Sequence, residues 1–194
     1  MQTMETDFLK KGGFFMSVVK FKRKPSELDY VENSWEIEVR VMNLCSKLSA
    51  RWARIYQQPI DRLSCLQFDF VNMACSINVT CAQDYYARKI FLKFSRACLQ
   101  ALEKRITDMV RVLYDNPSKC FNRKNGKNYT FKEATIMLDK KLEYLGTIYS
   151  RQYDLIKGVL ASDKRRYSKF DKEKIDDREI INLLVSKIIF ILFE

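Results

Sequence analysis

The sequence predicts an all-α protein: an antiparallel up-down four-helix bundle with a basic N-terminal arm and an extra C-terminal helix. Its 194 residues include only five glycines and three prolines, too few turn-forming residues for a many-stranded sheet. Apolar residues recur at steps of three and four over long stretches, which is the spacing of one face of a helix. With 47% hydrophobic and 30% charged residues, the composition is that of a folded domain.

Three regions are expected along the chain. Residues 1–25 form a flexible basic arm, residues 26–166 the bundle, and residues 167–194 a basic linker followed by an apolar helix. Lys-Gly-Gly codons just before Met16 can resemble a bacterial ribosome-binding site. Met16 is therefore one candidate for the natural start, with residues 1–15 as translated leader, and an ordinary basic tail is the alternative.

The first two helices are expected to meet at a proline. Apolar residues from Leu28 to Ile55 follow one stripe of about 28 residues, and Ser26 can cap its first turn. Pro59 is expected to open the second helix, which runs to Ile77 and leads through a short link into an antiparallel neighbour.

The third helix is predicted over residues 82–114 and the fourth from a capping box at Thr130 and Glu133, with a loop over 117–130 between them. The fourth stripe is broken at Lys141 and at Gln152. Together the stripes predict a shared core that contains Trp35, Leu48, Phe70, Met73, Phe94, Met109 and Leu138.

The apolar stretch over residues 180–193 is too short to cross a bilayer, which needs about 20 residues. A fifth helix that docks on the bundle or on another chain is favoured, and association with a membrane surface is the alternative.

The residue inventory argues against catalysis. The chain has no histidine, which removes Ser-His and Cys-His nucleophile pairs and His-ligated zinc. No glycine-rich phosphate loop occurs, so no catalytic residue, metal or cofactor is expected, although an inward carboxylate metal site remains an alternative. Six cysteines without a C-x-x-C pair or a secretory signal predict a cytoplasmic protein with reduced thiols.

The net charge of +11 favours a polyanionic partner: nucleic acid, an anionic membrane or an acidic protein. On the third helix, basic residues recur at steps that keep them beside the apolar face, and Asp108 alone interrupts them. Such a row can follow phosphates along a strand, whereas the alternative is an ordinary solvated face. The row consists of Lys89, Lys93, Arg96, Lys104 and Arg111.

Two further basic groups are predicted at one end of the bundle, because up-down counting places the first and third links together. Aromatic residues Tyr56, Phe121 and Tyr129 lie among them and can either stack on unpaired bases or cap the core. The groups are Arg51, Arg54 and Arg62 around Pro59, and Arg123, Lys124 and Lys127 in the long loop.

The segments Leu48-Ser-Ala-Arg-Trp-Ala-Arg-Ile-Tyr56 and Ile60-Asp-Arg-Leu63, followed by a long helix with a basic face from Arg88, resemble a known group. These are the four-helix bundle proteins that include the accessory variability determinants (Avd) of bacterial diversity-generating retroelements and the proteins encoded in 23S ribosomal RNA intervening sequences. The resemblance covers residues 27–115 and a fourth helix with a different entry. The loop over 117–129 and the tail over 167–194 depart from it.

The resemblance implies a non-catalytic homopentamer with a positive surface that binds the retroelement's reverse transcriptase and its template RNA or an RNA–DNA hybrid. Carried over by position, Arg51, Arg54 and Arg62 match the basic positions around the first link. Arg88 and Arg96 match the basic face of the third helix.

Overall fold

The computed structural model describes residues 25–115, 120–121 and 129–170, together with residues 178 and 182; residues 25–28 are described as backbone alone. Four helices make up this part of the chain: α2 (Pro25–Cys45), α3 (Ala50–Ser76), α4 (Ala82–Asp115) and α5 (Phe131–Arg166). Within these residues no strand occurs, and one isolated β-bridge joins Leu48 to Phe121. The predicted all-α class is confirmed.

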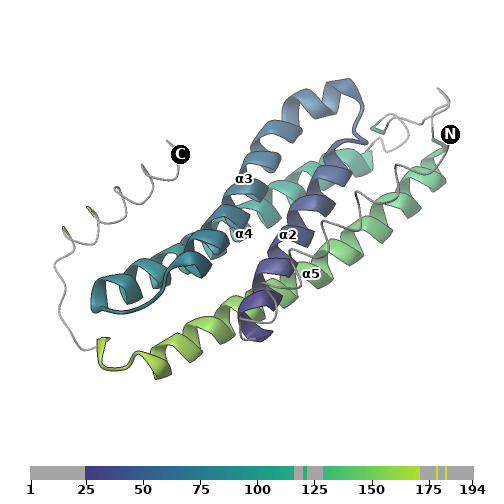
Figure 1. Ribbon diagram of the computed structural model, residues 1–194. Coiled ribbons are helices and arrows are strands. Elements are labelled where there is room, and N and C mark those ends of the chain that lie inside the picture. The colour runs from purple at the N-terminus through teal and green to yellow at the C-terminus, as the bar shows by residue number, and fades with distance from the viewer. Residues whose placement is uncertain (1–24, 116–119, 122–128, 171–177, 179–181, 183–194) are drawn as a thin grey trace, which may run out of the picture.

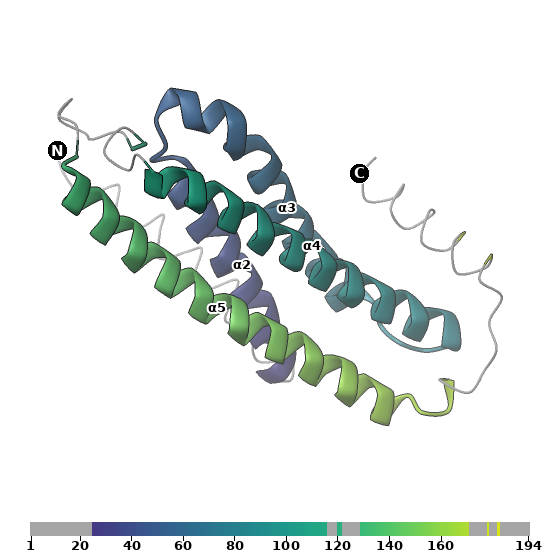
Figure 2. The ribbon, with the colours of Figure 1, turned by 180° about the vertical axis from the view of Figure 1, so that it is seen from behind.

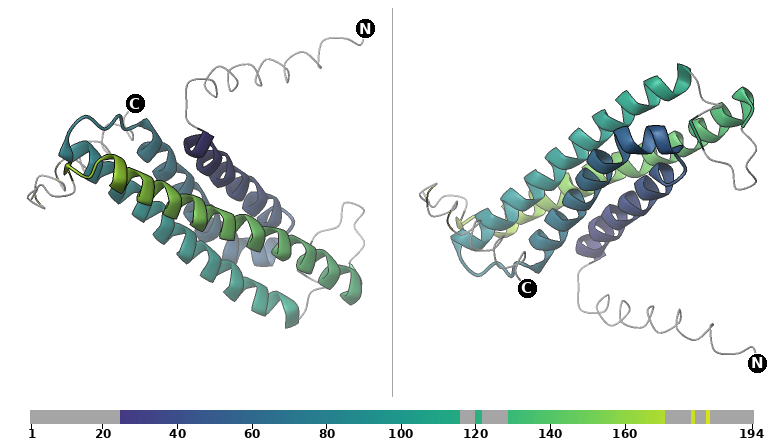
Figure 3. Two further views of the ribbon diagram at one scale, coloured as in Figure 1. Left: turned by 90° about the horizontal axis from the view of Figure 1, so that it is seen from below. Right: turned by 90° about the horizontal axis from the view of Figure 1, so that it is seen from above.

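The four helices pack as a bundle in which α3 contacts α2 and α4, and α5 contacts α2 and α4 (Figure 1). The view from behind shows α5 running along one side of the other helices (Figure 2). The views from below and above show α2 as the shortest helix, lying beside α3 and α5 (Figure 3). None of the described helices combines the length and the apolar composition that crossing a bilayer requires.

The start of α5 follows the predicted capping box. The Thr130 hydroxyl accepts a hydrogen bond from the Glu133 backbone N–H at 3.3 Å, and the Thr130 N–H donates to the Glu133 carboxylate at 3.0 Å. Both groups would otherwise be unpaired at a helix start, so this exchange fixes where α5 begins.

The predicted boundary between the first two helices is wrong. Helix α2 ends at Cys45, and the chain turns over residues 46–49 through tight bonds such as Leu48 N–H to the Cys45 carbonyl at 3.0 Å. Helix α3 then runs through Pro59 without a break. Proline already has a helical φ and removes one backbone hydrogen bond, a cost that tertiary packing of the same helix can offset. Ile60 is fully buried one residue later, which shows this packing.

The turn between α2 and α3 lies beside residues 120–121 of the link between α4 and α5, but this turn is at residues 46–49 and not at Pro59 as expected. The Ser49 N–H donates to the Cys120 carbonyl at 2.8 Å, and Leu48 bridges to Phe121 beside it. Phe121 is buried, and Tyr56 and Tyr129 pack against the same core. Of the two roles predicted for these three rings, their positions match capping of the core.

The predicted core is correct in part. Leu48, Met109 and Leu138 are buried, and Phe70 and Met73 are half-buried. Trp35 and Phe94 are 56% and 43% exposed. On α2 and on the first half of α4, the apolar stripe that the sequence predicted to be buried therefore lies next to the face that is buried in the structure. On α2 the buried face carries Tyr30, Ile37, Val41 and Leu44.

The buried face is difficult to recognise from apolar spacing because it also carries polar residues. These polar residues form a layer across all four helices. This polar belt consists of Asn33 and Ser34 of α2, Gln67 of α3, Ser95 of α4 and Gln152 of α5, all buried. Gln152 accepts from the Asn33 amide at 2.9 Å and donates to the Tyr30 carbonyl at 3.0 Å. Gln67 exchanges hydrogen bonds with Ser34, and the Ser95 hydroxyl donates to the Gln67 carbonyl at 2.9 Å.

Two apolar clusters flank the polar belt. One gathers around Ile37, Leu99 and Leu102, and the other around Tyr30 and Phe91. Because hydrogen-bonded partners in the belt must stay level with one another, a slip of one helix along its neighbour would leave buried polar groups unpaired. The belt therefore fixes the register of the bundle.

Several predictions lie outside the described residues. They are the N-terminal arm before residue 25, the loop cations Arg123, Lys124 and Lys127, and the C-terminal helix over residues 180–193.

Candidate anion-binding surfaces

Helix α4 presents a row of cations on its exposed side. Lys93, Arg96, Lys104 and Arg111 are all exposed, at steps of three, eight and seven residues that keep them on one side of the helix. Lys104 and Arg111 line the same shallow depression, which Glu103 and Asp108 also line. We call these four cations the α4 row. Two carboxylates, Glu103 and Asp108, lie beside the end of the row that carries Lys104 and Arg111.

Lys89 lies at the start of this side but has a local role. Its ammonium group lies 5.2 Å from the Tyr85 ring centroid and 5.3 Å from that of Tyr86. Such a cation–π contact holds the ammonium group against the helix surface, so Lys89 is half-buried.

The expectation that Arg88 lies on the outer basic face is wrong. Arg88 is buried, and its Nε donates to the Asp163 carboxylate of α5 at 2.7 Å. Its Nη1 donates to the Ala74 carbonyl at 2.9 Å, in the last turn of α3. Arg88 therefore joins three helices and has no access to a phosphate strand.

The three predicted arginines near Pro59 lie on one helix. Arg51, Arg54 and Arg62 are exposed on α3, and their spacing of three and eight residues places them on one side. The Arg51 guanidinium lies 5.4 Å from the Trp52 ring centroid, and the Trp52 and Tyr56 rings stack with centroids 6.1 Å apart. This second basic surface is thus attached to an aromatic pair rather than split across a turn.

A third basic surface, a groove between α2 and α5, was missed by the sequence analysis. It has a volume of about 460 Å³. Among the described residues that line it there are four cations and no carboxylate. The lining residues are Arg40, Asn43, Lys47, Met137, Lys140, Lys141, Tyr144 and Leu145.

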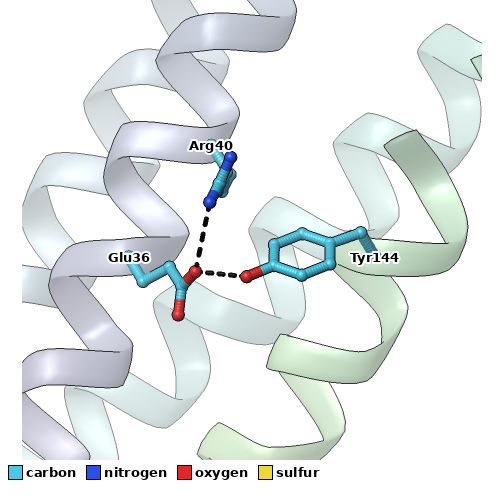
Figure 4. A network of polar contacts seen from close by, with 3 residues as sticks. All are labelled: Glu36, Arg40 and Tyr144. Carbon is cyan, nitrogen blue, oxygen red and sulfur yellow. Dashed lines mark hydrogen bonds and ion pairs between the residues drawn. The ribbon is translucent and has the colours of Figure 1, made fainter. Parts of the chain in front are cut away.

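Polar contacts hold one wall of this groove in place. The Glu36 carboxylate lies 3.5 Å from Arg40 Nη2 and accepts a hydrogen bond from the Tyr144 hydroxyl of α5 (Figure 4). The Arg40 guanidinium also lies 4.9 Å from the Tyr144 ring centroid. Arg40 is therefore positioned across the gap between the two helices.

The opposite wall crowds like charges together. Burial, and then the nearby charges of Lys47 and Arg40, lower the pKa of the Lys141 ammonium group. Lys141 is the residue that interrupts the apolar stripe of the fourth helix in the sequence. That interruption was the signal for the groove, but its partners are distant in the sequence: Arg40 lies on α2, and Lys47 lies in the turn that follows α2.

The described residues bear on two kinds of chemical site, metal-binding groups and reactive thiols. No group of three or more Cys, Asp or Glu side chains among them is placed to hold a metal ion. All six cysteines are free, and burial with the adjacent Asp61 carboxylate raises the pKa of the Cys45 thiol to about 12. A thiol with such a pKa stays protonated at neutral pH and is a poor nucleophile.

Neither family models, nor curated proteins, nor solved structures gave a match to this chain. The resemblance to retroelement accessory proteins therefore stays a prediction from the residues named above. Among the described residues we distinguish the three basic surfaces given above. Of these, the α4 row is the one that the sequence predicted as a row of cations on a single helix.

Proposed function

We propose that this protein is a non-catalytic basic bundle that binds nucleic acid, RNA or an RNA–DNA hybrid, through its phosphates. The observation that carries the proposal is the α4 row: four exposed cations along one side of a helix of 34 residues. At 1.5 Å per residue, the row from Lys93 to Arg111 extends over roughly 27 Å, enough to meet several phosphates of a strand. The net charge of +11 adds long-range attraction.

A narrower proposal rests on the family resemblance. The bundle would serve a reverse transcriptase of a diversity-generating retroelement in the cytoplasm, as a homopentamer of antiparallel up-down bundles with an extra C-terminal helix. The exposed Arg51, Arg54 and Arg62 support this reading, as they occupy the basic positions that the resemblance assigns. The order of the two apolar clusters, which reverses from each helix to the next, supports the up-down arrangement.

The salt dependence of binding tests the proposal. If about six phosphates are contacted, affinity for a structured RNA should fall by about three decades between 50 and 200 mM salt, linearly in log-log form. Reversing Lys93 and Arg96 to glutamate should reduce that slope by about two, since each contact contributes about 0.9. Circular dichroism should show unchanged helix content, because both side chains are exposed.

The matched control reverses Lys157 and Lys164, which are exposed on α5 and change the net charge by the same amount. Sequence preference should be weak, because the exposed lysines and arginines of the α4 row would contact phosphates, and phosphate contacts carry no direct sequence information. A slope that is the same in both double variants would mean that the α4 row only solubilises the protein.

A second candidate function is a protein–protein adaptor without a nucleic-acid role. It is favoured by large apolar side chains that the described chain leaves exposed, among them Trp35, Ile55, Phe131 and Ile136.

Both candidates predict symmetric self-association. Light scattering at micromolar concentration is expected to give a mass several times 23.1 kDa, and a monomeric mass would contradict the pentamer.

A further inference from the structure

The groove between α2 and α5 has the dimensions of a small-molecule site. Its volume of about 460 Å³ lies within the range of roughly 300–1,000 Å³ typical of ligand pockets. Its two walls come from Arg40, Asn43 and Lys47 on one side and from α5 on the other. It is therefore a built cavity between two helices and not a row of charges on one helix surface.

Like charges lie close together in the groove, although Arg40 has the Glu36 carboxylate as a neighbour. Among the described lining residues there are four cations and no carboxylate, and Lys141 is half-buried beside Lys47. Like charges in a partly desolvated place repel one another, and an anion bound between them removes that repulsion. The lowered pKa of Lys141 is consistent with this repulsion.

The ligand's charge and shape follow from the donors. Arg40 offers a planar set of five N–H donors, of which Glu36 engages one edge, and such a set matches the oxygens of a phosphate group. A phosphate monoester carries about −1.5 to −2 charges at pH 7, whereas a backbone phosphodiester carries one. The doubly charged monoester therefore neutralises the four cations of the groove better than a singly charged phosphodiester does.

Apart from Asn43, the lining residues other than the cations offer apolar surface. Met137 is half-buried, Leu145 is buried, and the Tyr144 ring is 42% exposed at the groove. An inorganic ion would leave this surface uncovered, whereas an organic group attached to the phosphate would pack on it. An aromatic ring is well suited because it can pack on Tyr144.

We propose that the α2–α5 groove binds an organic phosphate monoester of nucleotide size, with the phosphate between Arg40, Lys47 and Lys141 and the organic part on Met137, Tyr144 and Leu145. The same chemistry occurs in a free mononucleotide and at the 5′-phosphorylated end of a nucleic-acid strand. This site is separate from the α4 row, so the two proposals can fail independently.

Calorimetric titration with adenosine 5′-monophosphate, against adenosine as the phosphate-free probe, tests the site. Adenosine should bind at least about tenfold more weakly, the effect of losing one charge-assisted hydrogen bond. The variant Lys47→Gln/Lys141→Gln should lose a similar factor. Its matched control, Lys93→Gln/Arg96→Gln, removes the same charge from the α4 row and should bind within about twofold of wild type.

Thermal unfolding separates loss of the site from loss of the fold. The groove variant should be at least as stable as wild type, because it removes a like-charge contact. Equal affinity for adenosine and its monophosphate would overturn the proposal, as would a groove variant that binds like wild type. So would a groove variant and an α4-row variant that lose affinity equally, since that result would show dependence on net charge alone.

The source of the phosphate is then identified with single-stranded oligonucleotides bearing either a 5′-phosphate or a 5′-hydroxyl. They are tested in the Lys93→Gln/Arg96→Gln background to reduce binding along the α4 row. A gain of at least about tenfold from the 5′-phosphate, lost when Lys47 and Lys141 are also changed, would assign the groove to strand ends. Tight binding of the mononucleotide without that gain would assign it to a free nucleotide.

Discussion

Replacing Asp163 by alanine is expected to lower the free energy of unfolding by about 3–5 kcal/mol. The Arg88 Nε and Asp163 Oδ2 atoms lie 2.7 Å apart, and both side chains are only 6% exposed. Removing the carboxylate leaves a guanidinium charge in the interior without its counterion, which costs far more than the loss of a surface pair. Urea unfolding followed by circular dichroism measures the difference.

Arg88 cannot simply leave the interior, because it also completes the end of another helix. Its Nη1 donates to the Ala74 carbonyl, one of the last carbonyls of α3 that have no partner within the helix. The last turn of α3 contains no basic residue, so Arg88 supplies the positive charge that favours a helix C-terminus. Its position is thus held from two sides.

Asp154→Ala provides the matched control on the same helix. Asp154 is exposed, so its loss should change stability by no more than about 0.5 kcal/mol. Asp163→Asn keeps a hydrogen-bond acceptor while removing the charge, and should fall between the two. If Asp163→Ala were as mild as Asp154→Ala, the ion pair would contribute nothing net to the fold.

The helices could be predicted from the sequence where a local signal marks them. Thr130 and Glu133 form their capping box within four residues, so no tertiary information is needed. The turn over residues 46–49 contains neither glycine nor proline, and it is held by a bond from Ser49 to Cys120, which is distant in sequence. Pro59, the local signal nearby, marks a position inside α3.

The buried faces could be predicted only where they are uniformly apolar. On the second half of α4, Met109 is buried as expected, and Ile106 and Leu113 on the same face are buried with it. On α2 the inner face carries Asn33 and Ser34, whose partners belong to α5 and α3. Because the apolar spacing counts only hydrophobic residues, it predicted that the face of α2 with Trp35 is buried, and not the face with Asn33 and Ser34.

The candidate surfaces divide in the same way. The α4 row lies on one helix, and its spacing is visible in the sequence. The family resemblance placed Arg88 on this basic face as well, but Arg88 is buried, and its partner Asp163 is 75 residues away in the sequence. The groove combines Arg40 with Lys141, and only the packing of α2 on α5 brings them together. The single sign of this groove in the sequence was Lys141, which interrupts the apolar stripe of the fourth helix.

The contrast between Phe91 and Phe94 tests which face of α4 is buried. Phe91 is 1% exposed and Phe94 is 43% exposed. Both rings contact Phe70 of α3, with centroid distances of 6.1 Å for Phe91 and 5.4 Å for Phe94. The two residues therefore share a chemistry, a helix and an aromatic neighbour, and differ mainly in burial.

Phe91→Ala should lower the free energy of unfolding by about 3–5 kcal/mol, because it removes a fully buried ring and leaves a cavity that the packed helices cannot close. Phe94→Ala should cost no more than about 1.5 kcal/mol, the value of an aromatic pair, since water already reaches its ring. Urea unfolding of both variants gives the comparison. A larger loss for Phe94→Ala would mean that its face is covered in solution, and the same measurement at several protein concentrations would show a dependence on concentration if a second copy of the chain covers it.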